Sequence, residues 1–134
     1  MDKAWWDRYA NEAMSGFRGE LLTLNANPHG IRTVRIEHYR NSGGGAVSLA
    51  IARGAKRVIL VGYDMQRTNG MSHWHGDHPK GLGNAGKIAE WPAEFERMAK
   101  KNPGIEIVNC SRETALTCFP RRGLEEMLNE PDPT

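Results

Sequence analysis

The sequence predicts a small, single-domain α/β protein with a mainly parallel sheet. Three observations support this class. A chain of 134 residues suits one domain with one modest core. Residues 57–63 contain an unbroken apolar run, which is typical of a central parallel strand buried on both faces. Predicted strands and helices alternate along the chain, which favours crossover connections and helices on both faces of the sheet.

The N-terminal half is expected to hold two helices and two strands. Residues 4–14 place apolar side chains at helical spacing, whereas residues 21–24 form a short apolar run typical of a strand. Apolar and charged residues alternate over residues 31–37, which predicts a half-buried strand. Residues 46–52 are apolar almost all round and predict a buried helix, which Gly54 ends.

The C-terminal half is expected to continue the alternation after the strand at residues 57–63. Residues 65–87 form a long loop rich in Gly, His, Asn and Pro, and loops of this length are often functional. A proline in the first turn favours a helix over residues 89–101, and residues 105–108 predict a short strand. Ser111 can cap a further helix that runs through Cys118.

The composition is that of an ordinary globular protein. Hydrophobic residues make up 39% and charged residues 25% of the chain, and the formal net charge is only +2 with scattered basic residues, so nucleic-acid binding is not favoured. No run approaches the roughly 18 apolar residues that span a membrane, and the N-terminus lacks the apolar stretch of a signal peptide. Cys110 and Cys118 have no metal-type spacing, and without a secretion signal we expect reduced, partly buried thiols and a cytoplasmic protein.

Three large aromatic residues, Trp5, Trp6 and Tyr9, lie close to the N-terminus. Large aromatic side chains near a terminus need a surface to cover them. We therefore expect residues 1–20 to dock on the core or on a partner. A homo-oligomer that uses this aromatic segment is one expectation, since aromatic residues are enriched at interfaces.

A glycine-rich segment lies between a predicted strand and a predicted helix. It consists of Asn41, Ser42, Gly43, Gly44 and Gly45. Glycines let a backbone approach a phosphate closely, and a helix N-terminus offers free N–H groups and a positive dipole. The pattern Gly43-x-Gly45-x-x-Ser48 approaches the dinucleotide fingerprint, and Asp64 follows where a ribose-binding acid would lie. The segment indicates an anion or nucleotide site, or alternatively a tight turn with close helix–sheet packing.

A histidine-rich segment, His73-Trp74-His75-Gly76-Asp77-His78, lies in the long loop. In an extended conformation His73, His75 and Asp77 point to one side and His78 to the other. Imidazole and carboxylate groups are suitable ligands for a divalent metal, and the string matches the His-x-His-x-Asp-His motif of the metallo-β-lactamase superfamily. The chain is too short for the β-sandwich of that superfamily, and no histidine follows His78. The alternatives are a hydrogen-bonded polar loop and a general base beside a nucleotide.

Several segments in the rest of the chain carry a family likeness. They are residues 41–45, 49–50, 54–65, 107–111, 114–116 and 119–120. Together they resemble a Rossmann-like superfamily that includes bacterial lipooligosaccharide sialyltransferases and a domain related to archaeal hydroxymethylpterin pyrophosphokinase. The histidine-rich segment resembles a loop of uncharacterised phage and prophage proteins, which are the most similar.

The resemblance implies a three-layer Rossmann-like domain related to nucleotide-sugar transferases, located in the host cytoplasm if phage-encoded. Its family-like core spans residues 38–128, between the docking segment and a tail at residues 129–134. Family members begin with further strand–helix units, so the resemblance also implies that residues 1–134 lack an N-terminal part of a longer relative.

In the sialyltransferases that the chain resembles, a Ser-Gly turn contacts the cytidine nucleotide of the donor sugar, and the matching residues here are Ser42 and Gly43. Those enzymes use a histidine after the Gly-x-Asp strand as general base, which implies His73, His75 or His78. In this reading residues 42–45 hold the donor phosphate, and Asp64 orients ribose or a metal-bound water.

Two other functions remain open. One is a metal-binding protein or metal-dependent hydrolase that uses His73, His75, Asp77 and His78 as ligands of a divalent cation. The other is a non-catalytic domain that works through oligomerisation or another interaction.

Overall fold

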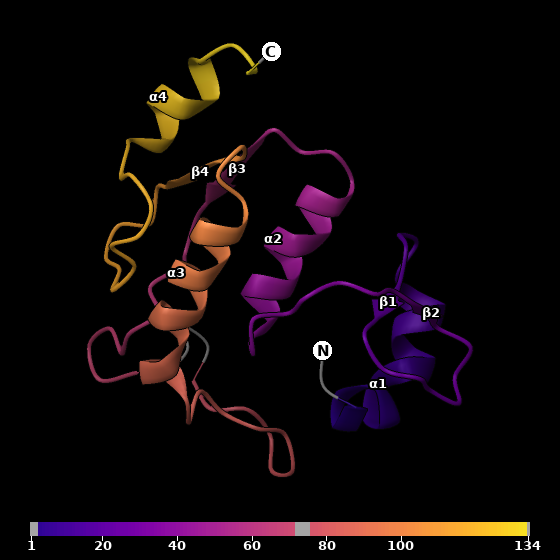
Figure 1. The fold of residues 1–134 in the computed structure, drawn as a ribbon. Helices are drawn as coiled ribbons and strands as arrows, with labels where there is room; N and C mark the ends of the chain where they lie inside the picture. The colour runs from indigo at the N-terminus through magenta and orange to yellow at the C-terminus, as the bar shows by residue number, and fades with distance from the viewer. Residues whose placement is uncertain (1–2, 72–75, 134) are drawn as a thin grey trace.

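The computed structural model describes residues 3–71 and 76–133 and shows a mixed α/β protein with small parallel sheets (Figure 1). The elements in chain order are α1 (Lys3–Gly16), β1 (Leu22–Thr23), β2 (Arg32–Thr33), α2 (Ser42–Ala52), β3 (Arg57–Leu60), the short 3-10 helix η1 (Ile88–Glu90), α3 (Trp91–Lys101), β4 (Glu106–Asn109) and α4 (Leu124–Asn129). In the part of the chain that the structure describes, no helix is long and apolar enough to cross a bilayer.

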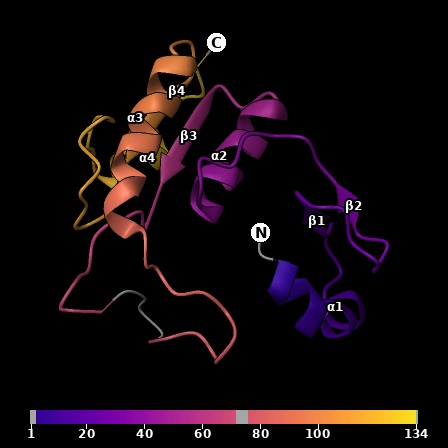
Figure 2. The same ribbon diagram turned by 60° about the horizontal axis from the view of Figure 1, so that its bottom comes forward.

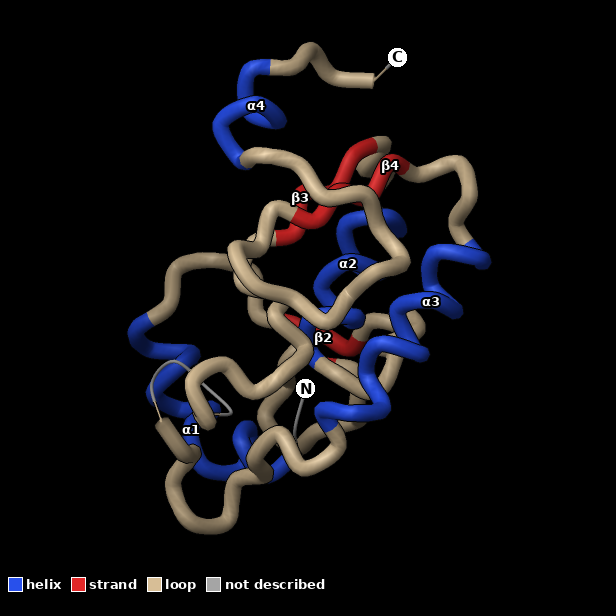
Figure 3. Tube along the Cα trace, turned by 90° about the vertical axis from the view of Figure 1, so that its left-hand side faces the viewer, coloured by secondary structure: helices blue, strands red, loops and turns tan. Residues whose placement is uncertain are grey.

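The strands form two separate parallel pairs in place of one larger sheet. β1 pairs with β2, and β3 pairs with β4 in a register that runs from Arg57 opposite Glu106 to Leu60 opposite Asn109. Figure 3 shows β3 and β4 side by side above α2. Among the described residues β3 has a strand neighbour on one side only, so its prediction as a central strand is wrong. The apolar run that suggested burial ends in Val61, which is 55% exposed.

The strand predicted over residues 31–37 is much shorter in the structure. β2 contains only two residues, and one further backbone bond runs from the Val34 N–H to the Thr23 carbonyl at 2.8 Å. The side chain of Asn27 fixes the preceding turn by accepting the N–H groups of His29 and Ile31, each at 3.1 Å. The alternation of apolar and charged residues predicted a half-buried strand, whereas both residues of the short β2 are exposed.

The larger hydrophobic cluster lies where α2 and α3 pack on the β3–β4 pair. Its centre is Phe95, which is fully buried and makes T-shaped contacts with Tyr63 and Phe119 at ring-centroid distances of 5.9 and 6.2 Å. Leu60 and Met98 join this cluster from β3 and α3. Figure 2 shows α2 and α3 flanking β3, so this cluster holds both helices and the strand in place.

A second, smaller cluster belongs to the N-terminal part of the chain. Trp6 and Ala10 of α1 are buried against Ile31, with Ala13 and Leu21 at its margin. The structure thus covers part of the aromatic segment with the chain itself. Trp5 remains 38% exposed at the surface of the same helix.

The helix predicted from Ser111 through Cys118 is absent, and this segment is irregular. The Ser111 hydroxyl accepts the Tyr63 N–H at 2.8 Å instead of capping a helix, and the Thr114 hydroxyl donates to the Tyr63 carbonyl at 2.7 Å. These bonds tie the segment to the chain that follows β3, and helical hydrogen bonds would compete with them. Cys118 lies in this segment as a half-buried free thiol, as does Cys110 just before it.

Candidate functional site

The glycine-rich segment forms the first turn of α2 instead of a turn ahead of it. Asn41 is the N-cap residue in an extended conformation, and its side-chain oxygen accepts the Gly44 N–H at 2.7 Å. The amide nitrogen of the same side chain donates to the Tyr39 carbonyl at 2.8 Å. An N-cap asparagine satisfies one of the amide groups that a helix start leaves unbonded, so helix formation begins at Ser42 despite three successive glycines.

Two of these glycines are required by the packing of the chain on itself. A Cβ atom on Gly44 would lie 2.8 Å from the Tyr39 Cβ and 2.9 Å from the His38 carbonyl oxygen. A Cβ atom on Gly43 would lie 2.9 Å from the Tyr63 ring, whose hydroxyl donates to the Gly43 carbonyl at 3.2 Å. Burial raises the pKa of Tyr63, so this hydroxyl stays protonated as a donor at neutral pH. These contacts pack the first turn of α2 closely on residues 38–39 and on Tyr63, which follows β3, and not on a strand residue as the helix–sheet alternative expected.

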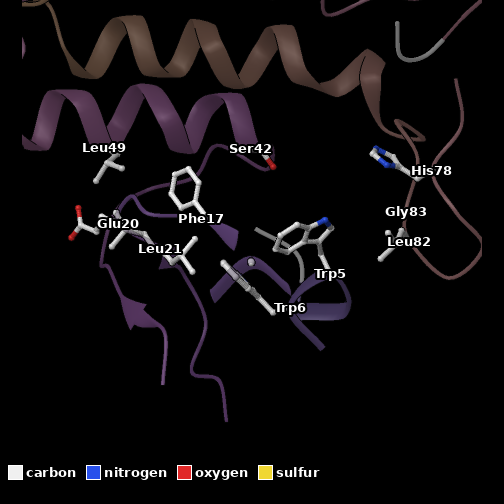
Figure 4. Close-up of a pocket in the computed structure, with 12 residues that line it drawn as sticks. Trp5, Trp6, Phe17, Glu20, Leu21, Ser42, Leu49, His78, Leu82 and Gly83 are labelled. Carbon is white, nitrogen blue, oxygen red and sulfur yellow. The ribbon is translucent and has the colours of Figure 1, made fainter. Parts of the chain in front are cut away.

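One cavity connects the N-terminus of α2 with the histidine loop. It has a volume of about 670 Å³ and lies between α1, α2 and the loop around residues 78–83 (Figure 4). Its wall is mainly apolar and includes Trp5, Trp6, Phe17, Leu21, Leu49 and Leu82, with Ser42, His78 and Glu20 as polar members. We call it the Trp5–His78 cavity. A mostly apolar cavity with a few convergent polar groups is the usual form of a small-molecule site.

The polar side chains reach this cavity from two different elements. Figure 4 shows the Ser42 hydroxyl at one side and the His78 imidazole at the other, with the Trp5 ring below them. Ser42 is the first residue of α2, and His78 is half-buried in the long loop. The backbone N–H of His78 donates to the Asn84 side-chain oxygen at 2.9 Å, which anchors this part of the loop.

The aromatic wall comes from α1. The rings of Trp5 and Trp6 make a T-shaped contact with their centroids 4.9 Å apart, and the centroid of the Tyr9 ring lies 5.4 Å from that of Trp5. Trp6 is 2% exposed, and its indole nitrogen has no hydrogen-bond partner within residues 3–71 and 76–133. From the sequence we expected these aromatic residues to dock on the core or to form an oligomer interface. Nothing in the sequence indicated that they border the same cavity as Ser42 and His78.

The structure separates some of the residues that the sequence grouped together. Asp64 lines a different cavity of about 830 Å³ beyond the ends of β3 and β4, where it accepts a hydrogen bond from the Thr68 hydroxyl at 3.1 Å. Gly45 borders a small apolar cavity of about 160 Å³ between α2 and the β1–β2 pair. Only Ser42 and His78, of the predicted site residues that the structure describes, line the Trp5–His78 cavity.

Two of the four ligands in the metal hypothesis lie outside the described part of the chain. His73 and His75 lie there, whereas Asp77 is exposed and His78 is half-buried. Within residues 3–71 and 76–133, no three His, Cys, Asp or Glu side chains form a group that could hold a metal ion. The four-ligand site therefore stays a prediction from the sequence.

Comparison with known proteins adds no family assignment. No family model matches the chain, and neither a curated protein nor a solved structure is similar to it. The resemblance to the sialyltransferase-like superfamily therefore stays a prediction carried by the motifs themselves.

Proposed function

We propose that the chain is a Rossmann-like domain related to nucleotide-sugar transferases and that it binds a nucleotide in the Trp5–His78 cavity. The observation that carries this proposal is that one cavity joins Ser42, at the start of α2, with an aromatic ring and a histidine. The positive end of a helix can bind a phosphate, and a flat aromatic surface can stack on a base. An imidazole can accept the proton in a transfer step. Asp64 lines another cavity and has no ligand contact in this proposal.

The phosphate would lie at the first turn of α2. Asn41 occupies the N–H of Gly44, whereas the N–H groups of Ser42 and Gly43 have no acceptor in the described part of the chain. Ser42 is exposed and adds a hydroxyl donor at the cavity wall. Amide donors and the helix dipole together favour an anion at such a position.

The base would stack on Trp5. This ring is 38% exposed and is held in place by Trp6 behind it. Stacking of a base on an aromatic side chain contributes roughly 1–3 kcal/mol and tolerates any base. The cavity volume of about 670 Å³ lies within the range of roughly 300–1,000 Å³ that is usual for small-molecule sites.

His78 would act as the general base in the transfer reaction. An acceptor hydroxyl that enters the cavity would give its proton to the imidazole while its oxygen forms the new bond to the sugar. The bond between the sugar and the phosphate breaks, and the nucleotide leaves with both bonding electrons. The positive end of α2 would stabilise the charge that develops on that phosphate.

A titration with cytidine monophosphate, followed by amide and indole NMR signals, tests this proposal. We expect saturable shifts at Ser42 to Gly45, at the Trp5 indole and at His78. The variant Trp5→Leu should weaken binding about tenfold or more, given the stacking energy above. Met14→Ala is the control, because Met14 is exposed on the same helix and lines neither this cavity nor the adjoining one that Tyr9 lines with Trp5 and His78. Absence of shifts at millimolar ligand would contradict the proposal.

A further inference from the structure

The outer edges of β3 and β4 differ in the hydrogen bonds that they make with the rest of the chain. The outer edge of β4 is covered at its last residue, because the Asn109 N–H donates to the Pro120 carbonyl at 2.9 Å and the Arg122 N–H donates to the Asn109 carbonyl at 3.4 Å. These two bonds form a parallel bridge between Asn109 and Arg121. No comparable bond reaches the outer edge of β3 from residues 3–71 or 76–133.

The bonding pattern shows which groups of β3 lie on that edge. In a parallel pair, alternate residues direct both N–H and C=O toward the same neighbour. The carbonyls of Lys56 and Leu60 accept bonds from the β4 side, at 2.9 and 2.8 Å. The N–H and C=O groups of the alternate residues Arg57, Ile59 and Val61 therefore point away from β4. This edge presents three donors and three acceptors in one row.

Apolar side chains accompany the open edge on the face opposite the core. Leu60 and Val58 pack into the cluster around Phe95, so Ile59 and Val61 project from the other face. Ile59 is half-buried and Val61 is 55% exposed. Leu124 of α4 is 39% exposed and borders the same cavity as Val61. Exposed strand edges with apolar side chains are sites where another strand is added.

We propose that this edge pairs with β3 of a second copy of the chain, antiparallel and around a two-fold axis at Ile59. The outward groups of residues 57, 59 and 61 are self-complementary in that arrangement. Ile59 opposes Ile59 of the second copy, Arg57 opposes Val61, and every outward donor meets an acceptor. The result is a four-stranded sheet in the order β4, β3, β3, β4.

Charge also favours a second copy as the occupant. Each Arg57 would lie opposite a valine, and its guanidinium is already bonded to Glu106 at 2.6 Å and Glu130 at 3.3 Å within its own chain. No two like charges are opposed along the strand, and the apolar residues Ile59 and Val61 extend into one continuous surface across the axis. The pairing therefore uses groups that the chain already presents and needs no other component.

Cysteine cross-linking tests the register of this pairing. Residues in a hydrogen-bonded antiparallel pair have Cα atoms about 5.5 Å apart, which is within disulfide range. Ile59→Cys should therefore form a disulfide with itself across the axis under mild oxidation, as identified by mass spectrometry of the linked peptides. Val61→Cys is the matched control, because two copies of residue 61 would lie about 13 Å apart along the strands. Equal cross-linking of both variants would overturn the register.

Sedimentation over a concentration series tests the association itself. We expect the wild-type chain to form dimers, and Val61→Lys, at a position already exposed in the single chain, to weaken dimerisation at least tenfold. Met14→Lys on the exposed side of α1 should leave it unchanged. A wild-type chain that is monomeric at all concentrations overturns the proposal. A dimer that Met14→Lys disrupts and Val61→Lys does not would overturn it in favour of the aromatic segment.

Discussion

At the scale of single residues, the start of α2 shows how a glycine can be required by the protein itself and not by a ligand. Gly44 and Gly45 are both buried against the preceding residues, yet only at Gly44 would a Cβ atom lie closer to them than van der Waals contact allows. A Cβ on Gly45 would meet the His38 side chain at 3.7 Å, which is ordinary contact. The two glycines therefore differ in their tolerance of a methyl group.

We expect Gly44→Ala to destabilise the protein by about 1–3 kcal/mol, the usual cost of overpacking. The neighbouring atoms belong to the His38 carbonyl and the Tyr39 Cβ, which cannot move without shifting the backbone. Gly45→Ala is the matched control and should be neutral or stabilising by up to about 1 kcal/mol, since alanine favours the helix. Urea unfolding of both variants measures the difference. Equal stability of the two would contradict this account of the first turn.

Asn41 is expected to determine where α2 begins. Asn41→Ala should lower the free energy of unfolding by about 1 kcal/mol, because the Gly44 N–H loses its acceptor. Asn41→Asp should lower it less, since a carboxylate still caps the helix and interacts favourably with its positive end. If both variants lose the same stability, the bond from Asn41 to the Tyr39 carbonyl is the important one, because only the asparagine side chain can donate it.

At the scale of elements, the sequence predicted those parts whose local pattern agrees with their surroundings. The run from Val58 to Leu60 lies in a strand, and the helix expected over residues 89–101 is present as α3, with Phe95 and Met98 buried on its inner face. The prediction of a helix capped by Ser111 was wrong. A serine that can cap a helix can equally accept an amide from another segment, and here its hydroxyl accepts the Tyr63 N–H. The conformational propensity of a residue indicates which local structures it can adopt. Which of them forms depends on hydrogen-bond partners that lie far away in the sequence.

An ion-pair group connects the segment before α2 with α3. Lys101 donates to Glu37 at 2.9 Å, and Arg97 also pairs with Glu37 while its guanidinium lies 4.7 Å from the centre of the Tyr39 ring. The Lys101 and Arg97 hydrogen bonds lower the pKa of Glu37 from 4.5 to about 2. This group holds the chain against α3 just before α2 begins.

The lowered pKa of Glu37 predicts a pH-dependent contribution to stability. Because the folded-state pKa lies below the unfolded value, the contribution is fully present above about pH 4.5 and is lost as the pH falls toward 2. Glu37→Gln should therefore be less stable than wild type at pH 6, and the difference should shrink over that window. Glu96→Gln on α3 is the control, since Glu96 makes no ion pair among the described residues. A difference that is independent of pH would rule out Glu37 ionisation as its origin.

At the scale of the whole molecule, the candidate site depends on the packing of an N-terminal part (α1, β1 and β2) against the rest of the chain from α2 onward. Ser42 and His78 were identified from glycine and histidine patterns, but Trp5 joined them only through the packing of α1. Asp64 was grouped with the glycines by its position after a strand, and the structure places it at another cavity. Sequence spacing indicates which end of a strand a residue occupies, whereas a shared cavity depends on packing between elements far apart in the chain.

The same two parts carry separate hydrophobic clusters of unequal size. The cluster around Phe95 includes residues of α2, β3, α3 and β4, whereas the cluster around Trp6 joins α1 to Ile31 and Leu21. The ion pair of Glu20 with Arg53, just beyond α2, is one of the polar links between the two parts. Because regions with few buried apolar contacts open more easily, the smaller cluster should open without loss of the larger one.

Amide hydrogen exchange and two core variants test this unequal stability. Amides of α1 should exchange through a partial opening, faster than those of β3 and β4, which require global unfolding. Phe95→Ala should lower the global free energy of unfolding by about 3–5 kcal/mol and accelerate exchange everywhere. Trp6→Ala should accelerate exchange in α1 and around Ile31 while leaving protection in β3 and β4 unchanged, since the two clusters share no residues. Uniform acceleration by Trp6→Ala would instead show that the two clusters unfold as one cooperative unit, and the Trp5–His78 cavity would then be as stable as the core itself.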